Sequence, residues 1–92
     1  MGWIRAQTAL ITIIGAHDDK GISYDEIIKI NNKTFHAKIE EHWEYLKPNS
    51  DNWSEKLIEE RDGLYFLNPV FKEANKGYLP DWRKMLEEKV NQ

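Results

Sequence analysis

The 92-residue chain contains no cysteine, which excludes a disulfide framework, a thiolate zinc site and a cysteine nucleophile. Its five glycines are isolated from one another, so it has no glycine-rich phosphate loop. The longest apolar run, Ala9 to Ala16, is interrupted by Thr12 and is far shorter than the roughly 20 residues that span a bilayer. The N-terminus also lacks the pattern of a secretory signal. We therefore expect a cytoplasmic protein with no membrane contact.

Positive charge is also scarce. The chain has 13 lysine and arginine residues against 16 aspartate and glutamate residues, for a formal net charge of −3. Because duplex DNA is bound largely through cations placed near its phosphates, the overall charge does not favour DNA binding, and only a local basic patch would support it. The densest basic group lies near the C-terminus and comprises Lys72, Lys76, Arg83 and Lys84.

Large apolar side chains, in contrast, are plentiful. Apolar residues make up 40% of the chain and aromatic residues 12%, with four tryptophans. A chain of this length has room for one core, and this composition predicts a folded domain that needs no covalent staple.

Two helices are predicted in the first third of the chain. Apolar residues between Trp3 and Ala16 fit a helix better than an alternating strand, and residues 17–21 then form a turn that ends at Gly21. Ser23 and Glu26 form a capping-box pattern, which predicts that a second helix starts at Tyr24 and ends near Asn31 and Asn32.

A third helix is predicted to begin at Thr34, which can act as its N-cap. Its apolar residues recur at spacings of four, four and three, which places them on a single helical face. These residues are Phe35, Ile39, Trp43 and Leu46. Pro48 and Asn49 are expected to end this helix.

A β-hairpin is predicted next. Two strand-forming runs, Leu57 to Arg61 and Leu64 to Leu67, flank the dipeptide Asp62-Gly63, a typical two-residue hairpin link. An alternative interpretation makes residues 51–60 a short helix that leads into a single strand. Trp53, in the polar segment before the hairpin, is expected to dock on the core.

The C-terminal region predicts an irregular stretch from Glu73 to Gly77 and then a helix with Pro80 in its first turn. Trp82, Met85, Leu86 and Val90 form one stripe on this helix. The stripe either packs on the domain or meets its own copy in a homodimer. We accordingly divide the chain into a domain at residues 1–70 and a C-terminal helical extension at residues 71–92.

Three helices followed by a hairpin is the order of a winged-helix domain, and two stretches carry the resemblance. The run Gly21-Ile22-Ser23-Tyr24-Asp25-Glu26-Ile27 resembles the entry to the second helix of that superfamily. The run Arg61-Asp62-Gly63-Leu64-Tyr65-Phe66-Leu67 is similar to a wing. The chain is also loosely similar to the winged-helix modules called HARE-HTH domains. The resemblance implies an α+β, mainly α fold with a three-helix core, a short antiparallel hairpin and an extra C-terminal helix.

The resemblance also implies binding to double-stranded DNA, with the third helix in the major groove and the wing on the backbone or minor groove. The residues that it places at DNA are Lys33, Thr34, His36 and Lys38 on the third helix and Arg61 on the wing. Glu40, Glu41 and Glu44 depart from this pattern because carboxylates repel phosphates, so contacts would be confined to the first two turns.

Other candidate sites are better explained as solvated surface. His36 and Glu40 lie four residues apart on the predicted helix, but two ligands do not make a metal site. His17 with Asp18 and Asp19 lacks the spacing of a calcium loop, and no nucleophile is specified near His42. We therefore expect no catalytic residue, no metal and no cofactor.

Two hypotheses follow. The first is a winged-helix DNA-binding domain that acts as a small transcriptional regulator or as the DNA-recognition module of a larger system. The alternative is a protein-interaction or assembly module without DNA binding, which the net negative charge favours. This alternative predicts an exposed apolar patch around Trp53 or Trp82.

Overall fold

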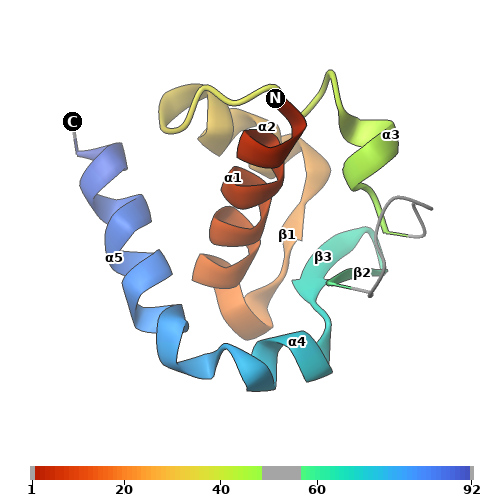
Figure 1. The fold of residues 1–92 in the computed structure, drawn as a ribbon, viewed down its shortest axis with the longest axis vertical. Coiled ribbons are helices and arrows are strands. Elements are labelled where there is room, and N and C mark those ends of the chain that lie inside the picture. Colours follow the sequence, from red (N-terminus) through yellow and green to blue (C-terminus); the bar gives the residue numbers. More distant parts are fainter. Residues whose placement is uncertain (1, 49–56, 92) are drawn as a thin grey trace.

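Helices and a small antiparallel sheet pack together in the computed structural model, which describes residues 2–48 and 57–91 (Figure 1). The mainly helical α+β class expected from the sequence is confirmed. In chain order the elements are α1 (Gly2–His17), the 3₁₀ turn η1 (Asp18–Lys20), β1 (Ile22–Ser23), α2 (Tyr24–Lys33), α3 (Trp43–Leu46), β2 (Ile58–Arg61), β3 (Leu64–Leu67), α4 (Pro69–Ala74), the 3₁₀ turn η2 (Lys76–Tyr78) and α5 (Leu79–Val90).

Helix α1 lies at the centre of the fold, with α2, β3 and α5 around it (Figure 1). One face of α1 is almost continuously apolar and buried, and each of its large aliphatic side chains contributes about 1.5–3 kcal/mol through removal from water. The buried cluster also takes Ile27 from α2, Tyr65 from β3 and Leu79 and Leu86 from α5. Helix α5 therefore shares its core with the rest of the chain.

The C-terminal helix packs closely on α1 at Gly15. A Cβ atom placed on this glycine would lie 2.4 Å from Cε3 of Trp82, so only glycine lets the indole lie against the backbone of α1. The Trp82 ring also stacks on Tyr78, with 6.4 Å between the ring centroids. The predicted stripe on α5 is thus divided between two environments. Trp82 and Leu86 pack inward, whereas the side chain of Val90 is 53% exposed.

The strongest local signals in the sequence are confirmed. Helix α2 begins at Tyr24, and the hydroxyl of Ser23 accepts a hydrogen bond from the amide of Glu26 at 3.3 Å. Strands β2 and β3 form the predicted hairpin, in which Asp62 and Gly63 both have positive φ angles, as a tight two-residue link requires. The strand order is β1-β3-β2, because β1 pairs with β3 through Ile22 and Ser23.

The predicted third helix is wrong over most of its length. Its first residue, Thr34, caps the C-terminus of α2 instead of starting a new helix. The chain from His36 to His42 runs through bends and turns, and only the four residues Trp43–Leu46 form an α-helix. His36 has a φ angle of 53°, a left-handed conformation that a right-handed helix excludes.

Asn31 accounts for the missing helix. Its side chain is 2% exposed, and its amide donates to the carbonyl of Ala37 at 2.7 Å while its Oδ1 accepts from the amide of Ala37 at 3.1 Å. The backbone carbonyl of Asn31 also accepts from the amide of His36 at 2.8 Å. These bonds fold residues 34–37 back onto the end of α2, and they occupy the carbonyl of Ala37, which in a helix starting at Thr34 would accept from the amide of Glu41.

Two further predictions are affected. The stretch Glu73 to Gly77, expected to be irregular, is largely helical, because Asn68 caps α4 by accepting a hydrogen bond from the amide of Val70 at 2.9 Å and η2 follows. The alternative helix over residues 51–60 is wrong for residues 58–60, which belong to β2. Trp53 lies outside the residues that the structure describes.

Candidate nucleic-acid interface

Four of the predicted DNA-contacting residues lie at the end of α2 and in the loop that follows. Lys33 is the last residue of α2 and is exposed, as is His36 in the loop. Lys38 is also exposed, and its Nζ lies 3.8 Å from a carboxylate oxygen of Glu41. Thr34 differs from these residues because it is buried and its hydroxyl donates to the carbonyl of Ile30 at 2.7 Å. Its side chain is committed to ending α2.

The fifth predicted residue, Arg61 on the wing, lies elsewhere. It pairs with Leu64, and Leu64 pairs with Ser23 immediately before α2, whereas Lys33 is at the opposite end of that helix. The ten residues of α2 separate the two positions by about 15 Å at 1.5 Å per residue. The structure therefore brings Lys33, His36 and Lys38 into one region and leaves Arg61 out of it.

Arg61 also has intramolecular partners. Its Nε lies 3.2 Å from a carboxylate oxygen of Glu59, and its guanidinium carbon lies 4.1 Å from the centre of the Phe66 ring. Nearby, the ammonium group of Lys72 donates a hydrogen bond to Asp19 and lowers the pKa of that carboxyl. This side of the hairpin is thus a network of matched charges over an aromatic ring.

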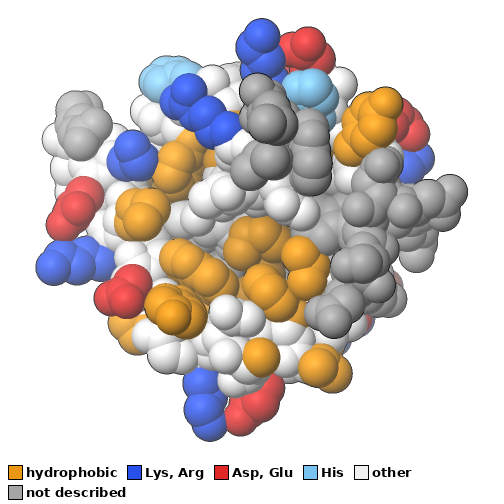
Figure 2. Space-filling model, viewed as in Figure 1, with side chains coloured by type: hydrophobic (Ala, Val, Ile, Leu, Met, Phe, Trp, Pro, Cys, Tyr) orange, Lys and Arg blue, Asp and Glu red, His pale blue; other side chains and the backbone are white. Residues whose placement is uncertain are grey.

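Two cationic side chains that were not predicted from the sequence contact Phe35. The guanidinium of Arg5, on α1, donates to the backbone carbonyl of Phe35 at 3.1 Å. The ammonium of Lys89, near the end of α5, lies 5.2 Å from the centre of the Phe35 ring. We call the set Arg5, Lys33, His36, Lys38 and Lys89 the Phe35 cluster. Figure 2 shows lysine, arginine and histidine side chains along the upper edge of the molecule, where Figure 1 places the segment between α2 and α3.

Carboxylates gather at the opposite end of α2. Burial raises the pKa of Tyr24, in the first turn of this helix, and the charges of Glu40 and Asp25 raise it further. Burial likewise raises the pKa of Tyr65, and Glu60 adds to that effect. Asp25 belongs to the first turn of α2, and Glu60 pairs with Tyr65 across the hairpin.

Little in the sequence signals the Phe35 cluster as a whole. Lys33, His36 and Lys38 are neighbours in the chain and were identified as candidates for that reason. Arg5 and Lys89 lie 84 positions apart, and they meet at Phe35 because α2 and α5 both pack on α1. No local pattern encodes that packing, so the two cations are recognisable only in the fold.

Other candidate chemistry has no support in the described residues. No group of three or more potential metal ligands is found among them, and none of their helices is long and apolar enough to cross a membrane. His17 uses Nδ1 to bond the carbonyl of Ile13 at 2.8 Å, as a histidine in the last turn of a helix commonly does. His42 packs edge-on against Tyr45, with 6.5 Å between the ring centroids.

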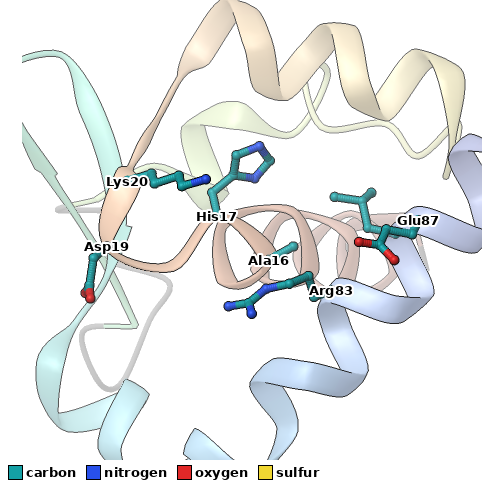
Figure 3. Close-up of a pocket in the computed structure, with 7 residues that line it drawn as sticks. Ala16, His17, Asp19, Lys20, Arg83 and Glu87 are labelled. Carbon is teal, nitrogen blue, oxygen red and sulfur yellow. The ribbon is translucent and has the colours of Figure 1, made fainter.

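A cavity of about 560 Å³ lies between the C-terminal end of α1 and α5 (Figure 3). Ala16 and Leu86 give it apolar walls, and its other lining residues are His17, Asp19, Lys20, Arg83 and Glu87. Lys20 and Arg83 are balanced in number by Asp19 and Glu87, so the lining does not select a ligand by charge.

Comparison of this chain with protein-family models, with curated proteins and with solved structures gives no match.

Proposed function

We propose that this chain is a DNA-binding domain of winged-helix type that contacts the phosphate backbone through the Phe35 cluster. The observation that carries the proposal is that Arg5 of α1 and Lys89 of α5 both contact Phe35, which lies in the short segment between the exposed Lys33 and Lys38. Cations held on separate rigid elements can each approach a different phosphate, and such contacts supply most of the affinity for a duplex.

Position in the fold supports the same conclusion. The Phe35 cluster includes the residues that the winged-helix resemblance assigns to the start of the recognition helix. The N-terminal end of α1 lies at this side of the molecule, where its backbone dipole adds partial positive charge (Figure 1). The acidic residues of α2, Asp25 and Glu26, lie in its first turn, at the far end of the helix from Lys33.

The proposal is tested by titrating a labelled duplex with the protein and following fluorescence anisotropy at about 50 and about 200 mM salt. If Arg5, Lys33, Lys38 and Lys89 each neutralise one phosphate, affinity should fall about 100-fold between these salt concentrations, from a slope of about −0.9 per contact. A double variant, Lys33→Ala with Lys38→Ala, should bind more weakly and lose about two units of that slope.

Lys76→Ala is the matched control, because it removes an exposed lysine that pairs with Glu73 outside the Phe35 cluster. It should leave both the affinity and the slope unchanged. Equal losses in the control and in the cluster variants would assign the binding to overall charge and would contradict an interface at the Phe35 cluster.

A protein-interaction module is the second candidate, and a different surface favours it. Figure 2 shows apolar side chains gathered in the middle of the face that it presents, between the segments labelled α5 and α4 in Figure 1. Among the exposed apolar residues, Val70 on α4 is 79% exposed and Met85 on α5 is 43% exposed. If no duplex is retained at either salt concentration, this candidate becomes the better account.

A further inference from the structure

We infer that the domain binds duplex DNA through its sugar-phosphate backbone alone and does not read the base sequence. The inference rests on the proposed function and specifies its ligand as duplex DNA of any sequence. Base readout requires a helix or a β-ribbon that carries donors and acceptors into a groove, and α3, the loop before it and the wing each fail that requirement for a separate reason.

The recognition helix is too short to read a groove. Helix α3 has four residues and is about 6 Å long at 1.5 Å per residue. Two of its residues, Glu44 and Tyr45, are exposed, and Glu44 pairs with Lys47 at 2.7 Å. A helix of one turn that presents a carboxylate cannot place several side chains on successive base edges, as a recognition helix does.

The residues before α3 are unsuited to base contacts as well. The hydroxyl of Thr34 donates a hydrogen bond to the carbonyl of Ile30 and is not available to a base. The left-handed turn at His36 and the bonds from Asn31 to Ala37 hold this segment as a compact loop across the end of α2. Lys33 and Lys38 remain exposed on it, and a lysine is a flexible point charge that can follow phosphates without a fixed pattern of hydrogen bonds.

The wing does not supply the missing readout. Its tip is Asp62-Gly63, and the negative charge of Asp62 would repel the phosphates of a duplex that the tip approached. Its one cation, Arg61, lies against Glu59 and the Phe66 ring. An arginine that reads a guanine or enters a minor groove would have to leave both partners, whereas Lys33 is exposed at the end of α2 and Lys38 is exposed with a carboxylate oxygen of Glu41 at 3.8 Å.

Competition anisotropy tests the inference. A labelled mixed-sequence duplex is first bound to the full chain and then displaced by unlabelled duplexes of equal length that are AT-rich, GC-rich or mixed. In a second experiment, a library of random duplexes is selected for binding to the protein over several rounds. We expect the competitors to be equivalent within about twofold, with dissociation constants on the order of 10⁻⁴–10⁻⁶ M at physiological salt. The selected pool should show no enriched motif.

Each outcome has a distinct meaning. A motif enriched by selection and preferred more than about tenfold would overturn the inference and leave the proposed function in place, because a single mismatched base pair costs a base-reading protein about five- to 150-fold. Absence of binding to any duplex at low salt would overturn the proposed function and the inference together. Arg61→Ala serves as the internal control and should leave binding unchanged, since loss of binding in this variant would place the wing at the DNA and contradict an interface confined to the Phe35 cluster.

Discussion

Replacement of Asn31 by leucine is expected to lower the free energy of unfolding by about 2–4 kcal/mol, because it removes two buried hydrogen bonds and strands the amide and carbonyl of Ala37. The two side chains are similar in size, so little of this loss should come from packing. Urea unfolding of the wild type and the Asn31→Leu variant measures it. Where the variant is still folded, its affinity for DNA should also fall, because the loop that presents His36 and Lys38 loses its anchor.

An aspartate at the same position provides the control. In Asn31→Asp one carboxylate oxygen can still accept from the amide of Ala37, but the other faces the carbonyl of Ala37 without a proton to donate. Burial beside an acceptor raises the pKa of the introduced carboxyl, so its penalty is present above that pKa and is relieved as the pH falls through it. The stability deficit of this variant should therefore be smaller at about pH 4 than at pH 7, near and well above the ordinary carboxyl pKa of about 3.9. Equal deficits at both pH values, or none, would contradict the role assigned to Asn31.

Alanine at Gly15 is expected to destabilise the fold by about 1–3 kcal/mol, which is the usual cost of overpacking. In an ordinary helix this exchange would stabilise by up to about 1 kcal/mol, because glycine is a poor helix former. Here the new methyl group would lie 2.4 Å from the Trp82 ring, so the ring must move away from α1. The melting temperature should fall by roughly 4–8 °C for each kcal/mol in a domain of this size.

The Trp82→Ala background isolates this effect. Without the indole, Gly15→Ala should become neutral or stabilising, because the helix preference of alanine then acts alone. A double-mutant cycle on the thermal unfolding of the four proteins gives the coupling energy directly. Additive effects would show that α5 does not rest on α1 at Gly15.

The elements that could be predicted from the sequence are those with local causes. The start of α2 depends on Ser23 and Glu26, which are three residues apart, and the hairpin depends on the positive φ angles of Asp62 and Gly63. Both signals act within a few residues and do not require knowledge of the rest of the chain. The final helix, with Pro80 in its first turn, is a third example.

The predicted third helix shows the limit of prediction from local sequence patterns. The apolar spacing correctly marked Ile39 and Leu46 as core residues, and both are fully buried. The inference from spacing to a continuous helix failed because a side chain in the preceding helix, Asn31, captures the backbone of Ala37. Asparagine competes with regular structure in this way, but its partner cannot be identified from residue order alone.

The candidate interface was predicted in part, for a related reason. Lys33, His36 and Lys38 were recognisable because they share one short segment. Arg5 joins them through the packing of α2 on α1, and Lys89 through the packing of α5 on α1 beside Gly15 and Trp82. Arg61 was assigned to the same surface by analogy, and the length of α2 separates it from the others.

The most direct test of a DNA interface at the Phe35 cluster is to titrate ¹⁵N-labelled protein with a short duplex and map the changes in amide chemical shift. The account predicts that the largest changes cluster at Arg5, at residues 33–38 and at Lys89, and that they weaken as salt is raised. The amides of Asp62 and Gly63 should change little. Changes concentrated at the hairpin, with residues 33–38 unaffected, would contradict it.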